Sequence, residues 1–361
     1  MPHCVPILTF GGDHEFLIVD GRNSAYPADL IYPEQRTAIK GSRYSLYNDG
    51  AQAEFGVSPD TCREYALDNI QAALRSAAYQ LDKFNKKNKK NLRIRLGTGC
   101  RISQRMKLAG GPMTRKSGCR CDYCAYTMDA NTPILNYETH LFVWCGFHIH
   151  IQHNKMSSTT KKHFGDLMSL ARECMMLDLC VAIPQLLITN DLVWLKRRRK
   201  HYGRAGCYRT PDHGLEYRTL GGDTLSSPAM VSFVLGMTRL AHALIINEHA
   251  DGILQQFDMH QVIHAINNCD RVEALKVWKK LRPVLQGASE RWAESPMYRS
   301  FAYAVEYIAD GGYKLEDGLG AWNLHLNSYH GSATPGWLKT AYNLILSPDY
   351  KRFEDSLSKK A

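Results

Sequence analysis

The feature that most restricts how this chain can fold is a set of four short segments, each with two polar residues separated by one position. Side chains on a β-strand alternate between its two faces, so residues two apart point the same way. The positions between or beside the polar residues are largely apolar. The pattern predicts four strands of an antiparallel sheet with one face packed on helices and one polar face. The four pairs are Asp13 with Glu15, Gln52 with Glu54, His148 with His150, and Glu216 with Arg218.

The residue types on the polar face indicate chemistry. A wet outer face of an ordinary sheet explains any one of these pairs. It explains less well a set of carboxylates, histidines and an arginine, which would converge if the strands share one sheet. Converging carboxylates repel one another unless a cation lies between them, and a hard divalent ion suits oxygen ligands. Two Mg²⁺ or Mn²⁺ ions could be shared among Asp13, Glu15, Glu54, Glu216 and one histidine.

Three arginines lie in or shortly before the last polar pair. They are Arg204, Arg209 and Arg218, in the segment YGRAGCYRTPDHGLEYRTL. Guanidinium groups match the geometry of phosphate oxygens and stay charged at any physiological pH. Together with the carboxylates, they predict a metal–nucleotide site in which the arginines neutralise phosphate oxygens during phosphoryl transfer.

Strand patterns dominate the first half of the chain. A helix is expected to start at the SPDT segment and to present apolar residues from Leu67 to Phe84 at helical spacing. The segment CYRTPDHGLEYRTL predicts a hairpin. Strands are expected over residues 7–19, 51–57, 92–97 and 140–152.

Helical patterns dominate the second half. A long helix is expected over residues 161–188, distorted by Pro184, and the chain is predominantly helical from about residue 229. The predicted fold class is α+β, with a catalytic antiparallel sheet covered by helices and a helical C-terminal region packed on it.

The charge of the chain leaves a second class of function open. The formal net charge is +10, and much of it lies in the runs KFNKKNKKNLRIR and LKRRRKH. Such runs are usually solvated faces, but they can also attract phosphate-rich ligands such as ATP or nucleic acid. A nucleic-acid-binding protein would leave the four polar pairs without a purpose, so these pairs favour the enzyme over the nucleic-acid-binding protein.

Eleven cysteines are spread through the chain, which indicates free thiols in a reducing cytoplasm. The CRCDYC segment has the thiolate density of a zinc site, but Cys119, Cys121 and Cys124 supply only three ligands. A fourth would have to come from Cys100, His140 or elsewhere. Free thiols are therefore favoured over zinc in this loop.

Several other classes of protein find no support in the sequence. The GGPMTRKSG segment lacks the glycine that precedes the lysine of a phosphate-binding loop. No dinucleotide-binding fingerprint and no nucleophile elbow are present. No window has the length of a membrane span, and the first residues do not read as a signal peptide, so a cytoplasmic protein is expected.

An ordered series of segments resembles the phage-type COOH-NH2 ligase family, the type 2 amidoligases, which are related to glutamine synthetase and glutamate-cysteine ligase. The segments are GGDHEF, DGAQAEF, GFHIHI and YGRAGCYRTPDHGLEYRTL, and the resemblance extends over about residues 8–235. It implies a glutamine-synthetase-like core over residues 1–235. Residues 236–361 would form a helical C-terminal region packed on that core.

The resemblance also assigns roles to residues. Asp13 and Glu15 match the acidic pair of the first strand, and Glu54 matches the metal ligand of the second. His148 matches a metal-binding histidine, and His150 would face nucleotide or substrate. Glu216 matches a late metal-binding glutamate, while Arg218 and Arg209 would contact phosphates.

The activity implied is ATP-dependent formation of an amide or peptide-like bond through an acyl phosphate, with Mg²⁺ or Mn²⁺. The substrates would be a small-molecule or peptide carboxylate and an amine, in the host cytoplasm if a phage encodes the protein, with an amidotransferase as a possible partner. One alternative is a phosphotransferase akin to guanidino kinases. Another is the basic, zinc-stabilised nucleic-acid-binding protein.

Overall fold

A large antiparallel sheet organises the molecule. The computed structural model describes residues 9–60, 63–111, 114, 122–131, 140–152, 167–289 and 319–322. In this part of the chain the sheet has ten strands, nine in the order β2-β3-β4-β1-β10-β12-β11-β7-β8, with β5 paired to β1. The predicted α+β class is confirmed.

The strands of the main sheet are mostly short. β1 (Phe10–Val19) and β4 (Gln52–Asp60) are the longest, and they pair side by side at its centre. The others are β2 (Ile39–Lys40), β3 (Tyr44–Asp49), β5 (Arg93–Arg95), β7 (Asp122–Cys124), β8 (Ala130–Asn131), β10 (Ile149–Gln152), β11 (Cys207–Arg209) and β12 (Gly214–Tyr217). A separate two-stranded sheet is formed by β6 (Gly99–Arg101) and β9 (Phe142–Trp144).

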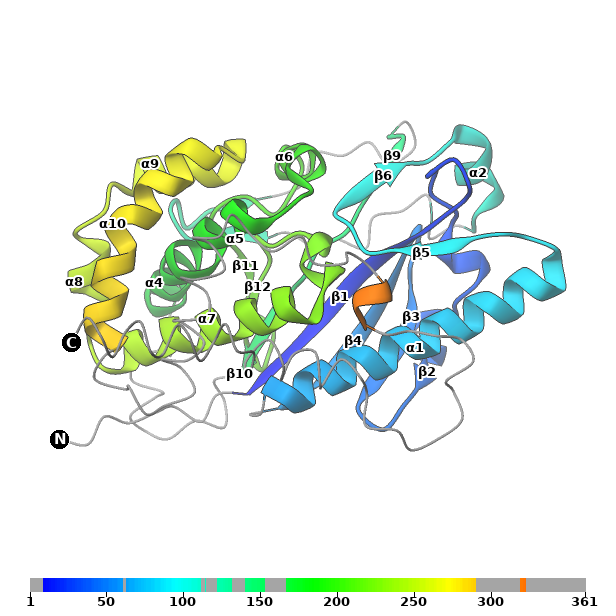
Figure 1. Cartoon of the computed structure of the whole chain (residues 1–361), viewed down its shortest axis with the longest axis horizontal. Coiled ribbons are helices and arrows are strands. Elements are labelled where there is room, and N and C mark those ends of the chain that lie inside the picture. Colours follow the sequence, from blue (N-terminus) through cyan, green and yellow to red (C-terminus); the bar gives the residue numbers. More distant parts are fainter. Residues whose placement is uncertain are drawn as a thin grey trace, which may run out of the picture.

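Helices cover one face of the main sheet. α1 (Arg63–Asn88) packs on β3 and β4, and α7 (Pro228–Ile246) contacts α1 and α4 (Leu167–Leu177) (Figure 1). The remaining helices are α2 (Gln104–Ala109), α5 (Ile183–Ile188), α6 (Leu192–Arg199), α8 (Ala250–Leu254), α9 (Met259–Asn268) and α10 (Arg271–Ser289). Short 3₁₀ turns are η1 (Ala28–Leu30), η2 (Gln35–Thr37), η5 (Gly222–Ser226) and η7 (Leu319–Trp322).

The apolar face of the strands forms the core with these helices. Phe16, Phe55 and Phe147 are completely buried in one cluster with the apolar stripe of α1. α7 is long and apolar enough to cross a membrane, but 89% of its apolar stretch is buried inside the molecule, as expected for a core helix. The predicted division into a packed face and a polar face is therefore what the sheet shows.

Two predicted elements differ from the structure. The first three residues of the SPDT segment are strand, since Ser58, Pro59 and Asp60 continue β4, and the described part of α1 begins at Arg63. The predicted strand over residues 140–152 is divided into β9 and β10, which belong to different sheets. The chain passes between the sheets at Gly146, where a Cβ atom would lie 2.3 Å from Nε2 of His148, so only glycine fits.

The predicted long helix is interrupted near its proline. Its described part consists of α4, a π-helical segment (Asp178–Ala182) and α5, in which Pro184 occupies the first turn. Proline lacks an N–H and its ring clashes with the carbonyl four residues earlier, which accounts for the widened turn. The predicted distortion is confirmed. Residues 161–166 of the predicted helix lie outside the described residues.

Candidate active site

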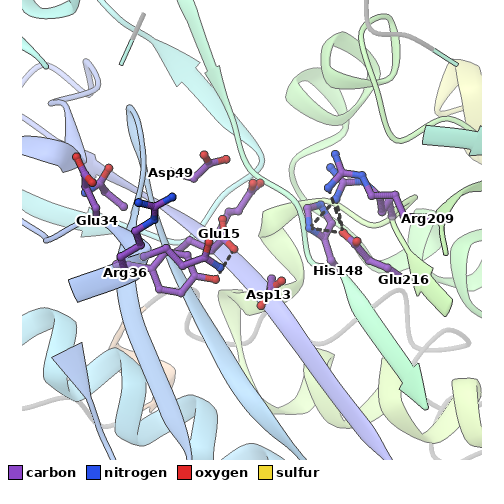
Figure 2. Close-up of a pocket in the computed structure, with 13 residues that line it drawn as sticks. Asp13, Glu15, Glu34, Arg36, Asp49, His148, Arg209 and Glu216 are labelled. Atoms are coloured by element: carbon purple, nitrogen blue, oxygen red, sulfur yellow. Dashed lines mark hydrogen bonds and ion pairs between the residues drawn. The ribbon is translucent and has the colours of Figure 1, made fainter. Parts of the chain in front are cut away.

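The four strands with polar pairs are adjacent in the sheet, in the order β4, β1, β10 and β12. Their polar face bears a cavity of about 460 Å³ (Figure 2). Figure 2 shows one wall carrying mainly carboxylates from β1 and the β3–β4 hairpin, and a second wall carrying His148, Glu216 and Arg209. The lining residues are Asp13, Glu15, Glu34, Gln35, Arg36, Tyr47, Asn48, Asp49, Glu54, His148, Arg209, Glu216 and Arg218.

Three carboxylates of the first wall lie close enough to hold one cation. Ligand atoms of Glu15, Asp49 and Glu54 all lie within 4.8 Å of one another. The register of the sheet produces this arrangement, because Glu15 pairs with Glu54 and Glu54 pairs with Tyr47 on the next strand. Side chains directly opposite on one face of neighbouring strands approach within contact distance.

Hydrogen bonds orient this acidic cluster. The hydroxyl of Tyr47 donates to Oε1 of Glu54 at 2.7 Å. The backbone N–H of Gly146 and the hydroxyl of Tyr202 both donate to Oε2 of Glu15. Each donor fixes one oxygen, and each carboxylate keeps further lone pairs for a ligand.

Burial and mutual repulsion raise the pKa values of the acidic wall. Burial, followed by the nearby Asp49, raises the pKa of Glu15 to about 7. Burial also raises the pKa of Glu54 well above its ordinary value, with Asp13 and Asp49 adding to the rise, and it raises the pKa values of Asp13 and Asp49. Carboxylates that resist ionisation together are the donor set that a divalent cation would stabilise, so these residues fit Mg²⁺ or Mn²⁺.

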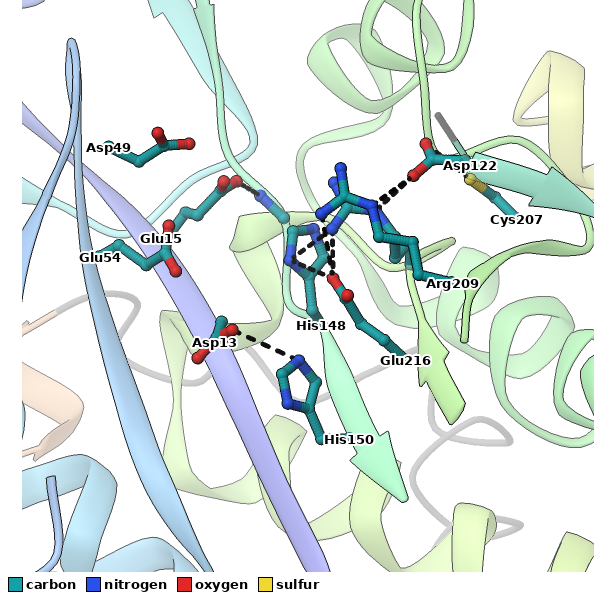
Figure 3. Close-up of polar contacts among 12 residues, drawn as sticks. Asp13, Glu15, Asp49, Glu54, Asp122, His148, His150, Cys207, Arg209 and Glu216 are labelled. Carbon is teal, nitrogen blue, oxygen red and sulfur yellow. Dashed lines mark hydrogen bonds and ion pairs between the residues drawn. The ribbon is translucent and has the colours of Figure 1, made fainter. Parts of the chain in front are cut away.

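The second wall is an ion-pair network around two arginines (Figure 3). Nη1 of Arg218 donates to Oε1 of Glu216, and Nη1 of Arg209 lies 3.9 Å from the same oxygen. Oδ1 of Asp122 lies 3.0 Å from Nε of Arg218 and 3.1 Å from Nε of Arg209. Asp122, which is 2% exposed, therefore holds both guanidinium groups from behind the pocket.

The arginines set the charge states of their neighbours. Burial would raise the pKa of Glu216, but Arg218, His150 and Arg209 outweigh it and lower that pKa below its ordinary value. Burial, with Arg218 adding to the effect, lowers the pKa of His148 well below its ordinary value. This shift favours the neutral imidazole, the form that binds a metal, and the buried Nε2 of His148 makes no hydrogen bond in the described part of the chain.

The nine residues predicted from the sequence are divided by the structure. Seven line the cavity: Asp13, Glu15, Glu54, His148, Arg209, Glu216 and Arg218. They do not form one cation-sized cluster, since His148 pairs with Glu216 at 3.5 Å on the second wall and Asp13 pairs with His150 at 3.4 Å. Within the described chain, the acidic cluster of Glu15, Asp49 and Glu54 is the group of this kind.

Two predicted residues are not among those lining the cavity. His150 contacts Asp13 and stacks on His213, so it lies beside the pocket and supports one of its carboxylates. Arg204 donates from Nε to the backbone oxygen of Arg199, 3.0 Å away, because the chain turns away from the sheet before β11. The structure shows no contact of Arg204 with the pocket, so its phosphate-binding role stays a prediction without geometric support.

Several lining residues were missed at the level of sequence. Asp49 ends β3 and faces Gln52 across a two-residue turn of Gly50 and Ala51. Glycine at the first central position is typical of a two-residue type II′ hairpin turn, and recognising it would have placed Asp49 opposite Gln52, two residues from Glu54. No comparable signal marks Asp122 or the η2 turn, because both reach the site only through the fold.

The cysteine cluster cannot be assembled from the described residues. Cys119 and Cys121 lie outside them, and Cys124 is a free thiol on β7. Two further candidates for a fourth zinc ligand are described. Cys100 is buried between β1 and the small sheet, while Nε2 of His140 accepts a hydrogen bond from Trp144.

Comparison with known proteins bears on the second wall. Residues 145–310 match the family model described as Phage phiEco32-like COOH.NH2 ligase-type 2. The predicted family is confirmed over this stretch. Just under half of the chain is matched, and the stretch contains His148, Arg209, Glu216 and Arg218. No curated protein and no solved structure was found to match the chain.

The matched stretch differs in extent from the expected resemblance. It begins after β9, so β1 and β4 with their carboxylates fall outside it. At the other end it continues past residue 235 through α8, α9 and α10, a region in which the sequence offered no readable motif. The ligase family therefore includes part of the helical region, and the domain boundary at residue 235, which α7 crosses, stays a prediction.

Proposed function

We propose that the protein is an ATP-dependent carboxylate–amine ligase that forms an amide or peptide-like bond through an acyl phosphate. The observation that carries the proposal is the single cavity in which a three-carboxylate cluster faces two arginines. The family match supports a ligase that joins a carboxylate to an amine. ATP use, the metal ions and the acyl phosphate are our inference from the charge pattern of the site.

The acidic wall would hold Mg²⁺ or Mn²⁺ through Glu15, Asp49 and Glu54. Asp13, His148 and Glu216 are further donors toward the middle of the pocket. A divalent ion bound there would neutralise charge on the triphosphate and on the phosphoryl group during its transfer. The donor set of carboxylates with one neutral imidazole suits either metal.

The arginine wall would bind the phosphate oxygens. Arg209 and Arg218 present guanidinium groups to the cavity and are fixed from behind by Asp122. An arginine that is already oriented needs little reorganisation as charge develops on the transferred group. Their present partner in the cavity, Glu216, would then be shared between an arginine and a cation.

The reaction would proceed in two displacements. An oxygen of the substrate carboxylate attacks the γ-phosphorus, the bond from that phosphorus to the bridging oxygen breaks, and ADP leaves. The amine nitrogen then attacks the carbonyl carbon, the bond from that carbon to the phosphate oxygen breaks, and phosphate leaves while the nitrogen loses a proton. The cavity walls bring the carboxylate and the triphosphate together, which supplies proximity as well as charge stabilisation.

The remaining expectations follow from the same proposal. The substrates would be small molecules or peptides bearing a carboxylate and an amine, and the enzyme would act in the cytoplasm. An amidotransferase that delivers the amine is compatible with the reaction. Nucleic acid has no part in this reaction. The exposed basic residues Lys196 and Arg197 of α6 lie outside the cavity lining and would not contact the substrates.

The test combines binding with product analysis. Titration calorimetry with Mg²⁺ and a non-hydrolysable ATP analogue should show binding to the native protein. Glu15→Gln and Glu216→Gln should bind far more weakly, whereas the distant Glu273→Gln on α10 should match the native protein. A screen of carboxylates and amines should then release ADP and phosphate only when both substrates are present.

Two results would contradict the proposal. One is a native protein that does not bind Mg-ATP, or variants that bind it as the native protein does. The other is a stable phosphorylated product formed without an amide, which would identify a guanidino-kinase-like phosphotransferase instead.

A further inference from the structure

A second cavity lies apart from the proposed active site. Its volume is about 170 Å³, and it lies between the end of β5, the connection from α5 to α6, and the start of α7. No residue of this cavity lines the larger one. At about 30 Å³ for each water molecule, it has room for a ligand of a few heavy atoms and is too small for a nucleotide.

Opposite charges line this cavity. Arg95, Asp191 and Asp223 all contribute to its lining. The charge of Arg95 lowers the pKa of Asp191, but the two side chains form no hydrogen bond in the part of the chain that the structure describes. A ligand in the cavity would therefore meet both a cationic and an anionic group.

A glycine leaves space beside both charged groups. A Cβ atom on Gly97 would lie 3.2 Å from Oδ2 of Asp191 and 3.3 Å from Nε of Arg95. Any side chain at this position would occupy space next to both groups. The absence of a side chain thus leaves room for a small group in contact with the guanidinium and the carboxylate.

The carboxylates are held rigidly by the protein. The backbone N–H of Thr98 donates to Oδ2 of Asp191 at 2.8 Å, and its hydroxyl donates to Oδ1 of Asp223 at 2.7 Å. The hydroxyl of Thr189 donates to the other oxygen of Asp223. Because these oxygens already accept hydrogen bonds, the pair suits the N–H groups of an ammonium better than the full oxygen shell of a metal ion.

Burial raises the pKa of Asp191 to about 6, and the neighbouring Asp223 adds to the rise, while the Thr98 hydrogen bond and the charge of Arg95 oppose it. A cationic group in the cavity would favour the ionised carboxylate. The rest of the lining is mixed: Leu96, Ile188 and Met230 would contact a short aliphatic chain, and the polar residues are Asn190, Ser226 and Ser227.

We propose that this second cavity binds a small aliphatic α-amino acid as a zwitterion. Its carboxylate would pair with Arg95, its ammonium group with Asp191 and Asp223, and its side chain would contact the apolar lining. This site is independent of the nucleotide pocket in its lining residues. A zwitterion satisfies both charged sides at once, which neither a simple anion nor a simple amine does.

The site is next to the strand that carries Glu15. Gly222, which adjoins Asp223, donates from its backbone N–H to the oxygen of Cys145 at 3.0 Å, and the next residue, Gly146, donates to the carboxylate of Glu15. A ligand that stabilises the η5 turn would therefore also stabilise the loop that orients a predicted metal ligand. Binding in the second cavity can thus influence the first site through two hydrogen bonds donated by backbone N–H groups.

The test is calorimetric titration of the full chain with glycine, L-alanine and L-valine at neutral pH. L-alaninamide and N-acetyl-L-alanine, which each lack one charge, should bind at least about 10-fold more weakly than L-alanine. Arg95→Gln and Asp191→Asn should abolish binding, and Gly97→Ala should do so by occupying the space beside both charged groups. Arg93→Gln, two residues away on β5 and outside the cavity, should leave it unchanged.

Several outcomes would overturn the proposal. They are no binding of any of the three amino acids to the native protein, equal binding of alaninamide or acetylalanine, and native affinity in Arg95→Gln. If Asp191→Asn does not fold, the analogue series on the native protein still decides. Binding of the ATP analogue serves as an internal control, because Arg95→Gln should retain it even when amino-acid binding is lost.

Discussion

At the scale of the residue, the acidic cluster places charge where the protein alone does not neutralise it. Glu54 lies between Glu15 and Tyr47 on adjacent strands, and Asp49 completes the group at the end of the hairpin. Such a site lowers the stability of the folded protein when no cation is bound. Residues that are retained for function often reduce stability in this way. Two single-residue predictions follow from the charges of buried carboxylates.

Replacement of Glu54 should stabilise the metal-free protein while removing its activity. Glu54→Gln keeps the size of the side chain and removes an ionisable group whose raised pKa means that the folded, metal-free protein must either bear repulsion in the cluster or take up a proton. Two unit charges about 4 Å apart repel by on the order of 1–4 kcal/mol at effective dielectric constants between water and a protein surface. In EDTA, the midpoint of thermal unfolding should therefore rise relative to the native protein. Added Mg²⁺ should raise the midpoint of the native protein and not that of the variant; a lower midpoint in EDTA would contradict this account.

Asp178 should make stability depend on pH. Burial raises its pKa to about 6, although the hydroxyls of Tyr217 and Tyr126 donate to it. Between pH 4 and 6 the folded protein keeps this proton and the unfolded chain loses it, so the free energy of unfolding falls as pH rises. The expected loss is about 3 kcal/mol, and it is complete above about pH 6. In urea titrations, Asp178→Asn should remove this part of the slope, and equal slopes in both proteins would refute the assignment.

At the scale of the element, single strands position whole groups of functional atoms. β7 is only three residues long, but it places Asp122 against the guanidinium groups of both Arg209 and Arg218. Cys207 on β11 also donates to Asp122, through Sγ at 3.2 Å. The arginine wall therefore depends on how β7 pairs with β11, and not only on the arginines themselves.

Loss of the Asp122 charge should lower activity without unfolding the protein. Asp122→Asn leaves the strand pairing in place but weakens the support of both arginines. A displacement of about 1 Å in a positioning group can cost about 100-fold in rate. We expect weaker binding of the ATP analogue and a turnover about 100-fold lower, with native circular dichroism. The matched variant Asp212→Asn, in the turn between β11 and β12, should behave as the native protein does.

At the scale of the whole molecule, a late segment returns to the core beneath the helices. Trp322 in η7 is fully buried; its indole N–H donates to the oxygen of Leu225 at 2.8 Å, and its own oxygen accepts from Nε2 of Gln71 at 2.9 Å. Figure 1 shows η7 beside α1 and the central strands. These contacts join segments 97 and 251 residues apart, so they couple η7 to the η5 turn and to α1.

Truncation of this tryptophan should destabilise the whole molecule. Trp322→Ala removes a large buried side chain and a hydrogen bond, and such changes cost about 3–5 kcal/mol. The midpoint of urea unfolding should fall. Unfolding should remain a single transition, and binding of the ATP analogue should be lost in that same transition. Val193→Ala, at a position that is 65% exposed, provides the control and should change the midpoint little. Two separate transitions would instead indicate that the helical region unfolds independently.

Much of the site was accessible from the sequence because strand periodicity is a local property. Alternation alone put Asp13 with Glu15 and Glu216 with Arg218 on polar faces, and seven of the nine predicted residues line one cavity. The SPDT segment, which was expected to start a helix, is strand as far as Asp60, because pairing of β4 with β1 extends the strand and tertiary pairing outweighs a local capping signal. Asp49 was within reach through the glycine of its hairpin turn, whereas Asp122 was not.

The sequence by itself determined the faces of the strands, the residue types on the polar face and a resemblance to a ligase family, which a family model matches over residues 145–310. Only the tertiary structure decided which polar residues meet. The order of the strands and their register placed Glu15, Asp49 and Glu54 together and moved Arg204 away, and neither property is encoded in local alternation. The second cavity has the same origin, since Arg95, Asp191 and Asp223 come from three distant segments that only the packed fold brings together.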